Sequence, residues 1–382
     1  MARARLFAVA LLVSALAVAC TKKNPKYCGK DADCPNGGHC NTTTNACESA
    51  DGGADAGDAG SDAKDASDAS DARFRCTMPS QCADGGPDGA SAVCEVDAGV
   101  CVECVADADC KASARPICDP TLHSCGPCTT DAQCAAKDPT GPGVCMSHQD
   151  GRCAADTETI YVKNATGCAT AAAVNAGTKA VPYCYPQNGV DAVDPARRLL
   201  VMSGPTDLRP WTIAVSGAQV SVVGQASVTI APGADVGVHL SAGSLYLRGL
   251  RVRNGSLAGV VADGGSDLQM DHCAVETNAG GGIFVDGASF DLVNTTVTGN
   301  GPGDDVGTSW GGLRLKNLLT TGDKSLRFVT VQSNNQVGVS CTGAVSGTNV
   351  LATMNTGGVD VSPTCGFTPC SADASSTCGA QN

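Results

Sequence analysis

The sequence predicts an all-β protein in which small disulfide-rich modules precede a coil of stacked parallel strands. Three observations support this prediction. One cysteine spacing occurs four times between Cys28 and Cys153, glycine is abundant while charge is sparse (47 glycines, 16% charged residues), and apolar residues recur every 22–24 positions toward the C-terminus. This composition suits repetitive β structure better than helical packing, and a repeat of that length is typical of one solenoid rung.

Residues 1–20 predict export. Two arginines within the first five residues precede an apolar run, Leu6–Ala19, which is too short to span a bilayer but fits a signal peptide. The run ends in Ala17-Val18-Ala19-Cys20, which resembles the bacterial lipobox. The resemblance implies lipidation of Cys20 and an anchor at the outer membrane or cell surface. An ordinary signal peptide cut near Ala19, giving a secreted protein, is the alternative.

The charge of the chain excludes one class of partner. The formal net charge is −13 at pH 7, and loss of the two leader arginines makes it −15 (−13 − 2). A surface this acidic repels nucleic acid, so no nucleic-acid partner is expected. The chain has 5 histidines and 13 aromatic residues (2 Trp, 5 Tyr, 6 Phe), which leaves little material for catalysis or base stacking.

Sixteen cysteines form four modules, one in residues 21–47 and three in residues 76–153. In each, five residues separate the first two cysteines and six or seven separate the last two. In an exported chain this repetition predicts disulfide bonds, because units of about 25 residues are too small for a hydrophobic core. Three connectivities are possible in each module, and the spacing does not choose between them. The cysteines are Cys28, Cys34, Cys40 and Cys47; Cys76, Cys82, Cys94 and Cys101; Cys104, Cys110, Cys118 and Cys125; and Cys128, Cys134, Cys145 and Cys153.

Two Cys-x-x-Cys sequences lie where modules meet. Cys101–Cys104 and Cys125–Cys128 are separated by twenty residues, which fits four-thiolate zinc, and Cys125-Gly126-Pro127-Cys128 matches the thioredoxin redox sequence. Each pair consists of the last cysteine of one module and the first of the next. The repeat therefore accounts for both pairs, and neither zinc nor redox chemistry is expected.

Paired aspartates come just before the second cysteine of modules 1 and 3: Asp31, Asp33, Asp107 and Asp109. Calcium is one interpretation of these pairs. Modules 2 and 4 lack them, so solvated turn residues are the preferred interpretation. No cofactor is expected, with calcium as the alternative.

Residues 48–75 predict a disordered acidic linker. Glu48–Ala72 consists almost wholly of Asp, Ala, Gly and Ser, and its aspartates recur every three or four residues. That spacing would stack like charges on one face of a helix, which favours a self-repelling tether instead. Its ends would lie about 25–30 Å apart on average, enough to hold the rest of the chain away from a membrane.

A β pattern begins after the last module, in a domain predicted to span residues 154–367. The strand pattern Ile160-Tyr161-Val162, followed by the apolar stripe Val190, Val193, Ala196 and Leu199, resembles the opening of bacterial right-handed parallel β-helix proteins. The resemblance implies a first strand, then a helix that closes the end of the stack, with a disulfide between Cys168 and Cys184.

Three apolar tracks then predict three short strands per rung, with side chains stacked on a common axis. Asparagines at the ends of some repeats predict a structural ladder at one corner, since Asn tolerates αL turns and can hydrogen-bond its neighbour. The tracks are Val252, Val275, Val297, Val331 and Met354; Val260, Ile283, Leu313, Val339 and Val359; and Leu245, Leu268, Phe290 and Leu326; the ladder is Asn254, Asn278, Asn300 and Asn355.

Over Thr159–Pro363 these repeats resemble the pectate-lyase-like superfamily of right-handed parallel β-helices. The resemblance specifies architecture, because binding proteins and enzymes share this fold. It implies that an enzyme of this kind would carry carboxylates and basic residues in one outer groove. The lyases use aspartates that hold calcium with an arginine base, and the hydrolases use paired aspartates, Gly-His-Gly and Arg-x-Lys.

One insertion is similar to such a groove. Asp304 and Asp305 precede Trp310 and the strand that carries Arg314 and Lys316, whose side chains face outward by alternation. Acids, bases and an aromatic could hold and cleave an acidic sugar, with Trp310 as the ligand-binding ring. No Gly-His-Gly occurs, and the groups lie in one rung, so a solvated loop beside a charged strand is preferred. His272, beside Asp271, is interpreted as an exposed strand residue.

The remaining cysteines predict two closing bridges, Cys341–Cys365 and Cys370–Cys378, and one buried free thiol, Cys273. Residues 368–382 are predicted to be a C-terminal tail. The hypothesis from sequence is an exported, lipid-anchored surface protein whose β-helix binds polysaccharide or another cell-surface molecule without catalysis. A polysaccharide lyase or glycosidase centred on the insertion is the alternative hypothesis, and a mechanical spacer is a third.

Overall fold

The computed structural model describes residues 39–41, 46–48, 76–82, 93–204, 211–305 and 307–370. The chain divides into two compact units, Met1–Ala72 and Arg73–Asn382. In the first, β1 (His39–Asn41) pairs antiparallel with β2 (Ala46–Glu48), which places Cys40 opposite Cys47. The predicted signal peptide, Cys20, Cys28, Cys34, Asp31, Asp33, Cys378 and residues 49–75 of the linker lie outside the described residues. Among those described, no helix has the length and apolarity needed to cross a membrane.

Modules 2, 3 and 4 share one disulfide connectivity. The first cysteine bonds to the third and the second to the fourth, so the two bridges of a module interlock. Cys101 and Cys104 therefore belong to different bridges, as do Cys125 and Cys128. The bridges are Cys76–Cys94 and Cys82–Cys101, Cys104–Cys118 and Cys110–Cys125, and Cys128–Cys145 and Cys134–Cys153.

Each of modules 2, 3 and 4 consists of a helical turn followed by a small antiparallel pairing that carries its third and fourth cysteines. The turns are η3 (Pro79–Cys82), η4 (Asp107–Asp109) and α1 (Asp131–Lys137). The pairings are β3 (Val93–Glu95) with β4 (Val100–Val102), β5 (Ile117–Asp119) with β6 (Ser124–Gly126), and the bridge between Cys145 and Cys153.

In each of modules 2, 3 and 4, one polar side chain accepts hydrogen bonds from the backbone at the start of the helical turn. Gln81, Asp109 and Gln133 occupy equivalent positions just before the second cysteine, and each accepts hydrogen bonds from the two backbone N–H groups that follow the first cysteine. Asp107 accepts a further bond from Cys118 N at 2.8 Å. Both aspartates of module 3 lie partly exposed in the turn, as predicted from the sequence, and their carboxylates in addition satisfy backbone donors that would otherwise be unpaired.

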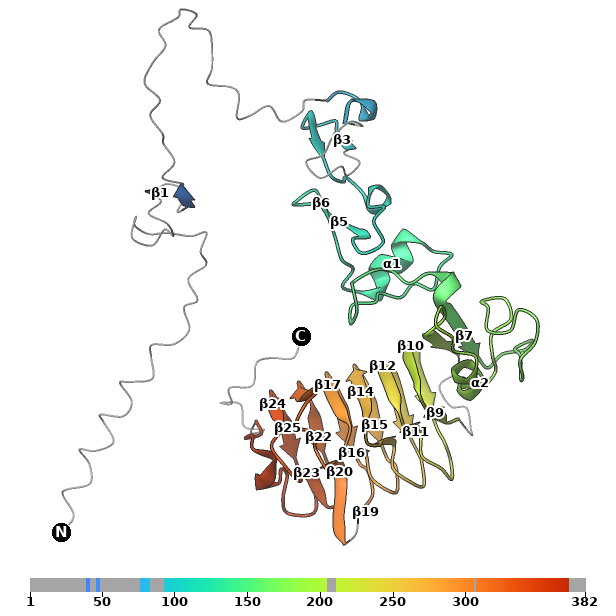
Figure 1. Ribbon diagram of the computed structural model, residues 1–382, viewed down its shortest axis with the longest axis vertical. Coiled ribbons are helices and arrows are strands. Elements are labelled where there is room, and N and C mark those ends of the chain that lie inside the picture. The colour runs from blue at the N-terminus through green and yellow to red at the C-terminus, as the bar shows by residue number, and fades with distance from the viewer. Residues whose placement is uncertain are drawn as a thin grey trace, which may run out of the picture. The chain divides into compact units, whose positions relative to one another are not determined.

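After module 4 the strands stack as a parallel β-helix (Figure 1). Every described pairing in its two sheets is parallel except that of β19 with β20. The 12-stranded sheet contains β7 (Thr159–Lys163), β8 (Leu199–Ser203), β10 (Ala218–Ile230), β12 (Gly243–Arg253), β14 (Ser266–Asp271), β15 (Ala274–Glu276), β17 (Ser289–Val293), β18 (Thr296–Thr298), β21 (Lys324–Arg327), β22 (Thr330–Gln332), β24 (Ser346–Thr348) and β25 (Leu351–Thr353). The 7-stranded sheet contains β9 (Ile213–Val215), β11 (Val238–Leu240), β13 (Val260–Ala262), β16 (Ile283–Asp286), β19 (Gly303–Asp305), β20 (Thr308–Lys316) and β23 (Val337–Cys341).

The long strands β10 and β12 bend and so divide the larger sheet into two faces. At the bend Gly249 has a φ of 67°, and a Cβ on Gly224 would lie 2.6 Å from Gly249 O, so both positions favour glycine. The first face continues the start of β12 through β14, β17, β21 and β24. The second face continues its end through β15, β18, β22 and β25, and the 7-stranded sheet is the third face.

Alternation along each strand builds the core. In β14, Leu268 and Met270 are buried, whereas Asp267, Gln269 and Asp271 are half-buried on the outer surface. Val252, Val275 and Val297 lie opposite one another in successive rungs and are fully buried. Each such side chain contributes on the order of 1.5–3 kcal/mol relative to exposure, so the stack supports itself once several rungs are present.

The C-terminal rungs depart from the predicted tracks. Val331 lies opposite Ala352, whereas Met354 is 68% exposed and has a φ of 56°. The rungs near this end differ in length, so a constant repeat misplaces their members. In the other two tracks the error is two residues: Val361 rather than Val359 lies opposite Val339, and Leu292 rather than Phe290 lies opposite Leu326.

A ladder of four buried asparagines runs along one corner. Asn278, Asn300, Asn334 and Asn355 each donate a side-chain N–H to a carbonyl of the preceding rung. The Oδ1 of each of the last three accepts the backbone and side-chain N–H groups of the asparagine before it, at 2.9–3.0 Å. Asn254 is not a member, because Gly255 occupies the equivalent position and donates its own N–H to Asn278.

Short segments close both ends of the stack. The N-terminal helix α2 (Pro186–Asp191) is shorter than the predicted apolar stripe, since Leu199 already begins β8. A Cβ on its Gly189 would lie 2.9 Å from Val162, which shows how closely the helix packs on the first rungs. The disulfides Cys168–Cys184 and Cys341–Cys365 hold the two ends. Cys370 is also disulfide-bonded, and Cys273 is a buried free thiol.

Candidate functional site

The acidic and basic residues of the insertion do come together, on the third face beside the β19–β20 hairpin. Asp305 accepts hydrogen bonds from Arg314 Nε at 3.1 Å, Arg314 Nη2 at 3.0 Å and Lys316 Nζ at 2.8 Å. The side chains of Asp305 and Arg314 are only 9% and 8% exposed. Arg314 also donates to Ser340 Oγ at 2.9 Å, and Lys316 Nζ lies 3.6 Å from Asp286. The cluster therefore ties the hairpin to neighbouring rungs.

These charges neutralise one another. Hydrogen bonds from Lys316 and Arg314 hold the pKa of the Asp305 carboxyl below its usual value. A carboxylate held in its ionised form by two cations is a poor general acid, and its oxygens already have partners. Asp304 is exposed and accepts a bond from Gly307 N at 3.2 Å in the turn. This arrangement favours an anchor for the hairpin over a reacting pair of acids.

Trp310 belongs to the interior of the same hairpin. Its side chain is 3% exposed and lies near Phe284, with ring centroids 5.9 Å apart. A Cβ on either Gly281 or Gly303 would lie 2.4 Å from the indole, so the backbone approaches the ring closely at two places. The sequence predicts Trp310 as the ligand-binding ring of the insertion. The structure instead makes it the ring that packs the hairpin onto the stack.

Module 4 packs against the outer surface of the first face. Val144 and Met146 from the module and Ala154, which follows its last cysteine, form one buried cluster with outward-facing apolar residues of the first rungs. These are Tyr161, Leu199, Val201 and Val223. This cluster is separate from the core inside the stack. The first rungs thus have apolar side chains on both sides of the sheet, and the module covers the outer set.

Polar contacts fix the position of module 4 on the stack. Arg248 of β12 donates to Cys145 O at 2.8 Å and to Asp131 Oδ1 at 2.6 Å, and its side chain is 12% exposed. Gln225 Nε2 donates to Pro142 O at 2.8 Å.

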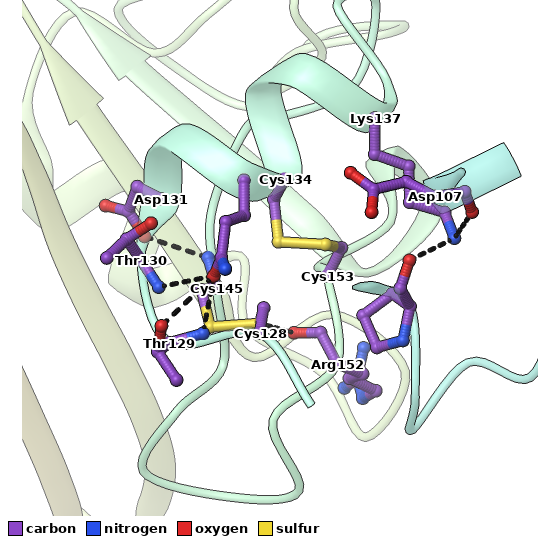
Figure 2. Close-up of a disulfide and its surroundings, with 12 residues drawn as sticks. Asp107, Cys128, Thr129, Thr130, Asp131, Cys134, Lys137, Cys145, Arg152 and Cys153 are labelled. Atoms are coloured by element: carbon purple, nitrogen blue, oxygen red, sulfur yellow. Dashed lines mark hydrogen bonds between the residues drawn. A yellow bond between two sulfur atoms is a disulfide. The ribbon is translucent and has the colours of Figure 1, made fainter. Parts of the chain in front are cut away.

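Module 4 in turn holds module 3. Lys137 Nζ reaches the carbonyl oxygens of Asp107, Cys110 and Pro116, and Figure 2 shows this lysine beside Asp107 and the two interlocked disulfides.

The loop that follows Cys145 places an imidazole on the sheet. The His148 ring stacks on Tyr246 of β12, with centroids 3.6 Å apart and planes 8° from parallel. Its Nε2 lies 3.3 Å from Ser221 Oγ of β10. Burial, reinforced by the nearby Arg248 guanidinium, lowers the pKa of His148 to about 4, so the ring is neutral at physiological pH.

A cavity of about 330 Å³ opens where this loop meets the first face. Its walls carry hydrogen-bond donors and acceptors, both charged and neutral, together with the Tyr246 ring. The residues that line it are Ser147 and His148 from module 4, and Tyr246, Gln269, Met270, Asp271, Asp291, Val293, Asn294 and Arg327 from β12, β14, β17, β21 and the turn after β17.

Hydrogen bonds hold both carboxylates of the cavity in place. Asp291 accepts a hydrogen bond from Arg327 at 2.6 Å and another from Ser325. Asp271 lies 2.6 Å from His272 Nδ1 and accepts a bond from Asn294 at 3.1 Å. His272 is 65% exposed, as the sequence predicts, although it lies at a corner rather than within a strand. Amide, hydroxyl, carboxylate and guanidinium groups beside an aromatic ring can hold a ligand rich in hydroxyls.

Sequence reasoning missed this site. The alternation Asp267-Leu268-Gln269-Met270-Asp271 and the track through Leu245 and Leu268 do indicate that Tyr246, Gln269 and Asp271 face outward in adjacent rungs. No sequence signal indicates that His148, about a hundred residues earlier, lies on Tyr246. That contact depends on how module 4 packs against the stack.

Among solved structures, a crystal structure of the pectate lyase Pel9A is similar to this chain at 14% sequence identity. The match covers 51% of this chain and 68% of that chain, with a TM-score of 0.27. A likeness of this degree carries no argument about activity, and the β-helix is established by the parallel register of its strands. No family model matches the chain, and no curated protein matches it.

Proposed function

We propose that this protein is a non-enzymatic carbohydrate-binding protein, with its site in the cavity between module 4 and the first face. The observation that carries the proposal is the cavity itself. At about 330 Å³ it lies at the lower end of the usual range for small-ligand sites, about 300–1,000 Å³. The polar groups around it suit a sugar, whose hydroxyls hydrogen-bond, and the stacked rings of His148 and Tyr246 form one side of the cavity.

The pairing of the charged groups supports binding over catalysis. Arg327 already neutralises Asp291, and Arg314 and Lys316 neutralise Asp305 of the insertion. Acid–base cleavage needs two groups whose environments push their pKa values apart. The lyase or glycosidase hypothesis predicts new reducing ends or unsaturated products, and these are measured in the same experiment.

The setting of the site also belongs to the proposal. Export through residues 1–20 and a lipid anchor at Cys20 would place the β-helix at the outer membrane or cell surface, where polysaccharides are available. The disulfides of modules 2–4 support an oxidising compartment. Its partners would be a polysaccharide or another cell-surface molecule, and a membrane through the anchor.

A matched pair of glutamine substitutions tests the site. Gln269 lines the cavity on β14, whereas Gln332 lies half-buried on β22 of the second face. In the full chain carrying Cys20→Ala for solubility, Gln269→Ala should weaken binding on a glycan array and by calorimetry about tenfold, the effect of losing about 1.4 kcal/mol. Gln332→Ala should bind as the parent does. Equal loss in both variants, or no binding by the parent, would contradict the proposal.

The anchor has its own test. Cys20→Ala should move the protein from the membrane fraction to the soluble fraction, because the modified residue would be lost. Cys273→Ala, which removes the buried free thiol of the β-helix, should leave fractionation unchanged. If the Cys20→Ala protein stays with membranes, lipidation at this cysteine is not what holds it there.

A further inference from the structure

A second cavity lies on the same side of the stack, on the other flank of the module 4 loop. Its volume is about 300 Å³, and its walls include Gln149, Arg152, Arg198, Gln219 and Ser221. Met146 and Gln149 line this cavity, while Ser147 and His148 line the first one. Four consecutive residues, Met146–Gln149, thus form a wall between two hollows over the outer surface of one sheet.

His148 makes this wall continuous with the sheet. Ser221 and Tyr246 lie directly opposite each other in neighbouring rungs, β10 and β12. The imidazole stacks on Tyr246 at 3.6 Å and its Nε2 lies 3.3 Å from Ser221, so one ring spans both rungs. A glycan chain that runs along the first face from β21 toward β12 would therefore meet the His148 ring at the end of the first cavity. Without the ring, the outward row from Ser221 through Tyr246 to Gln269 would be continuous.

The wall is held firmly enough to stop a ligand. The loop forms a tight turn in which Met146 O accepts hydrogen bonds from Gln149 N at 3.0 Å and Gly151 N at 3.1 Å. Disulfides fix it at both sides, through Cys145 and Cys153. Arg248 adds a bond from the sheet to Cys145 O. Displacing His148 would therefore require breaking contacts of the whole module.

We infer that the first cavity receives the end of a glycan chain rather than its middle, and that His148 sets this specificity as a positioning residue. The inference rests on the proposed carbohydrate-binding function and adds to it which part of the polymer is recognised. The last sugar unit lies against the loop, and the rest of the chain leaves over β14, β17 and β21. His148 ends the groove by the volume of its ring, because its Nε2 already lies 3.3 Å from Ser221 Oγ and its Nδ1 is buried.

The test compares chain lengths and chain ends. The probes are cello-, xylo- and chito-oligosaccharides, from dimers to octamers, with their parent polymers, titrated into the full chain carrying Cys20→Ala. At equal molar concentrations of chains, affinity should level off once the cavity is filled and should then change less than about twofold with length. Blocking the recognised end, by reduction at one terminus or substitution at the other, should weaken binding about tenfold or more.

A matched histidine pair isolates the wall. His148→Ala should open the groove, so that affinity rises with chain length and end-blocked chains bind. His239→Ala removes a half-exposed imidazole from β11 on the third face and should keep end selectivity. His148→Phe retains a ring on Tyr246 and should keep the plateau with length. These two variants also show whether a loss in His148→Ala follows from the wall or from general destabilisation.

The outcomes separate the two proposals. If the parent binds an oligosaccharide series but affinity rises steadily with chain length, and end-blocked chains bind equally well, end recognition is overturned while carbohydrate binding stands. If no ladder or polymer binds, the carbohydrate-binding function fails and the inference falls with it. End recognition is supported if three results occur together. Affinity levels off with chain length, blocking the recognised end weakens binding, and both effects disappear in His148→Ala.

Discussion

At the scale of single residues, positions decide which polar side chains are structural. Asn278, Asn300 and Asn334 are buried because each satisfies backbone and side-chain groups of adjacent rungs. Asn254 differs from them by one position and has a φ of 61°, so it lies outside the ladder. The sequence identifies asparagine as the corner residue, but the register of each rung selects the asparagine that takes part.

The ladder gives a sharp prediction at this scale. Asn334→Ala removes an oxygen that accepts two hydrogen bonds from Asn300 and an amide that donates to Val297 O, all of them buried. Each buried group left without a partner costs about 1–3 kcal/mol, so the free energy of unfolding should fall by at least about 2 kcal/mol.

The neighbouring Asn335 provides the control. It is exposed and accepts one side-chain bond, from Thr356. Asn335→Ala should change the free energy of unfolding by less than about 0.5 kcal/mol. Chemical denaturation of both variants measures the difference. Similar stabilities for the two would show that the ladder contributes little.

At the scale of elements, the first face of the stack carries two kinds of surface. Over the first rungs its outer side chains are apolar and module 4 covers them, and beyond Tyr246 they are polar and line the cavity. The alternation of each strand is readable in sequence. The partner that covers one part and leaves the other open is not, because it comes from a separate segment of the chain.

Arg248 should be the main polar contact of this docking. Arg248→Met keeps most of the side-chain volume but leaves Cys145 O and Asp131 without their guanidinium partner. Amide hydrogen exchange in residues 140–150 should become faster, and sugar binding should weaken, because the loop forms one wall of the cavity. Arg251→Met is the control, because the Arg251 side chain is 46% exposed and pairs with Glu276 on the sheet. It should leave exchange in the loop unchanged. Equal exchange in both variants would show that apolar contacts alone hold the module.

At the scale of the whole molecule, two strategies of stabilisation are joined in one chain. Modules 2–4 depend on interlocked disulfides, whereas the β-helix is held by a continuous core from Ile160 to Cys365. The β-helix has bridges at its ends, and its middle rungs hold only the free thiol Cys273 among described cysteines. Burial raises the pKa of that thiol to about 12, so it is kept in its neutral form.

Reduction should therefore separate the two parts. With a strong thiol reductant at neutral pH, modules 2–4 should unfold, since each bridge contributes about 2–4 kcal/mol to a unit without a core. The β-sheet circular dichroism of the stack should persist, and the newly uncovered Tyr161, Leu199 and Val201 should bind a hydrophobic dye. Loss of the sheet signal together with the modules would contradict this independence.

The sequence by itself determined the disulfide modules, the solenoid with its apolar tracks, and the boundary between the cysteine-rich and the alternating β segments. Spacing and alternation are local properties, so they can be read from the sequence. Only the tertiary structure decided the register of the last rungs, the internal neutralisation of Asp305, the burial of Trp310 and the placement of His148 on Tyr246. These depend on insertions of irregular length and on contacts between distant segments. A repeat specifies the next rung of a stack, but it carries no information about what packs on the outer surface.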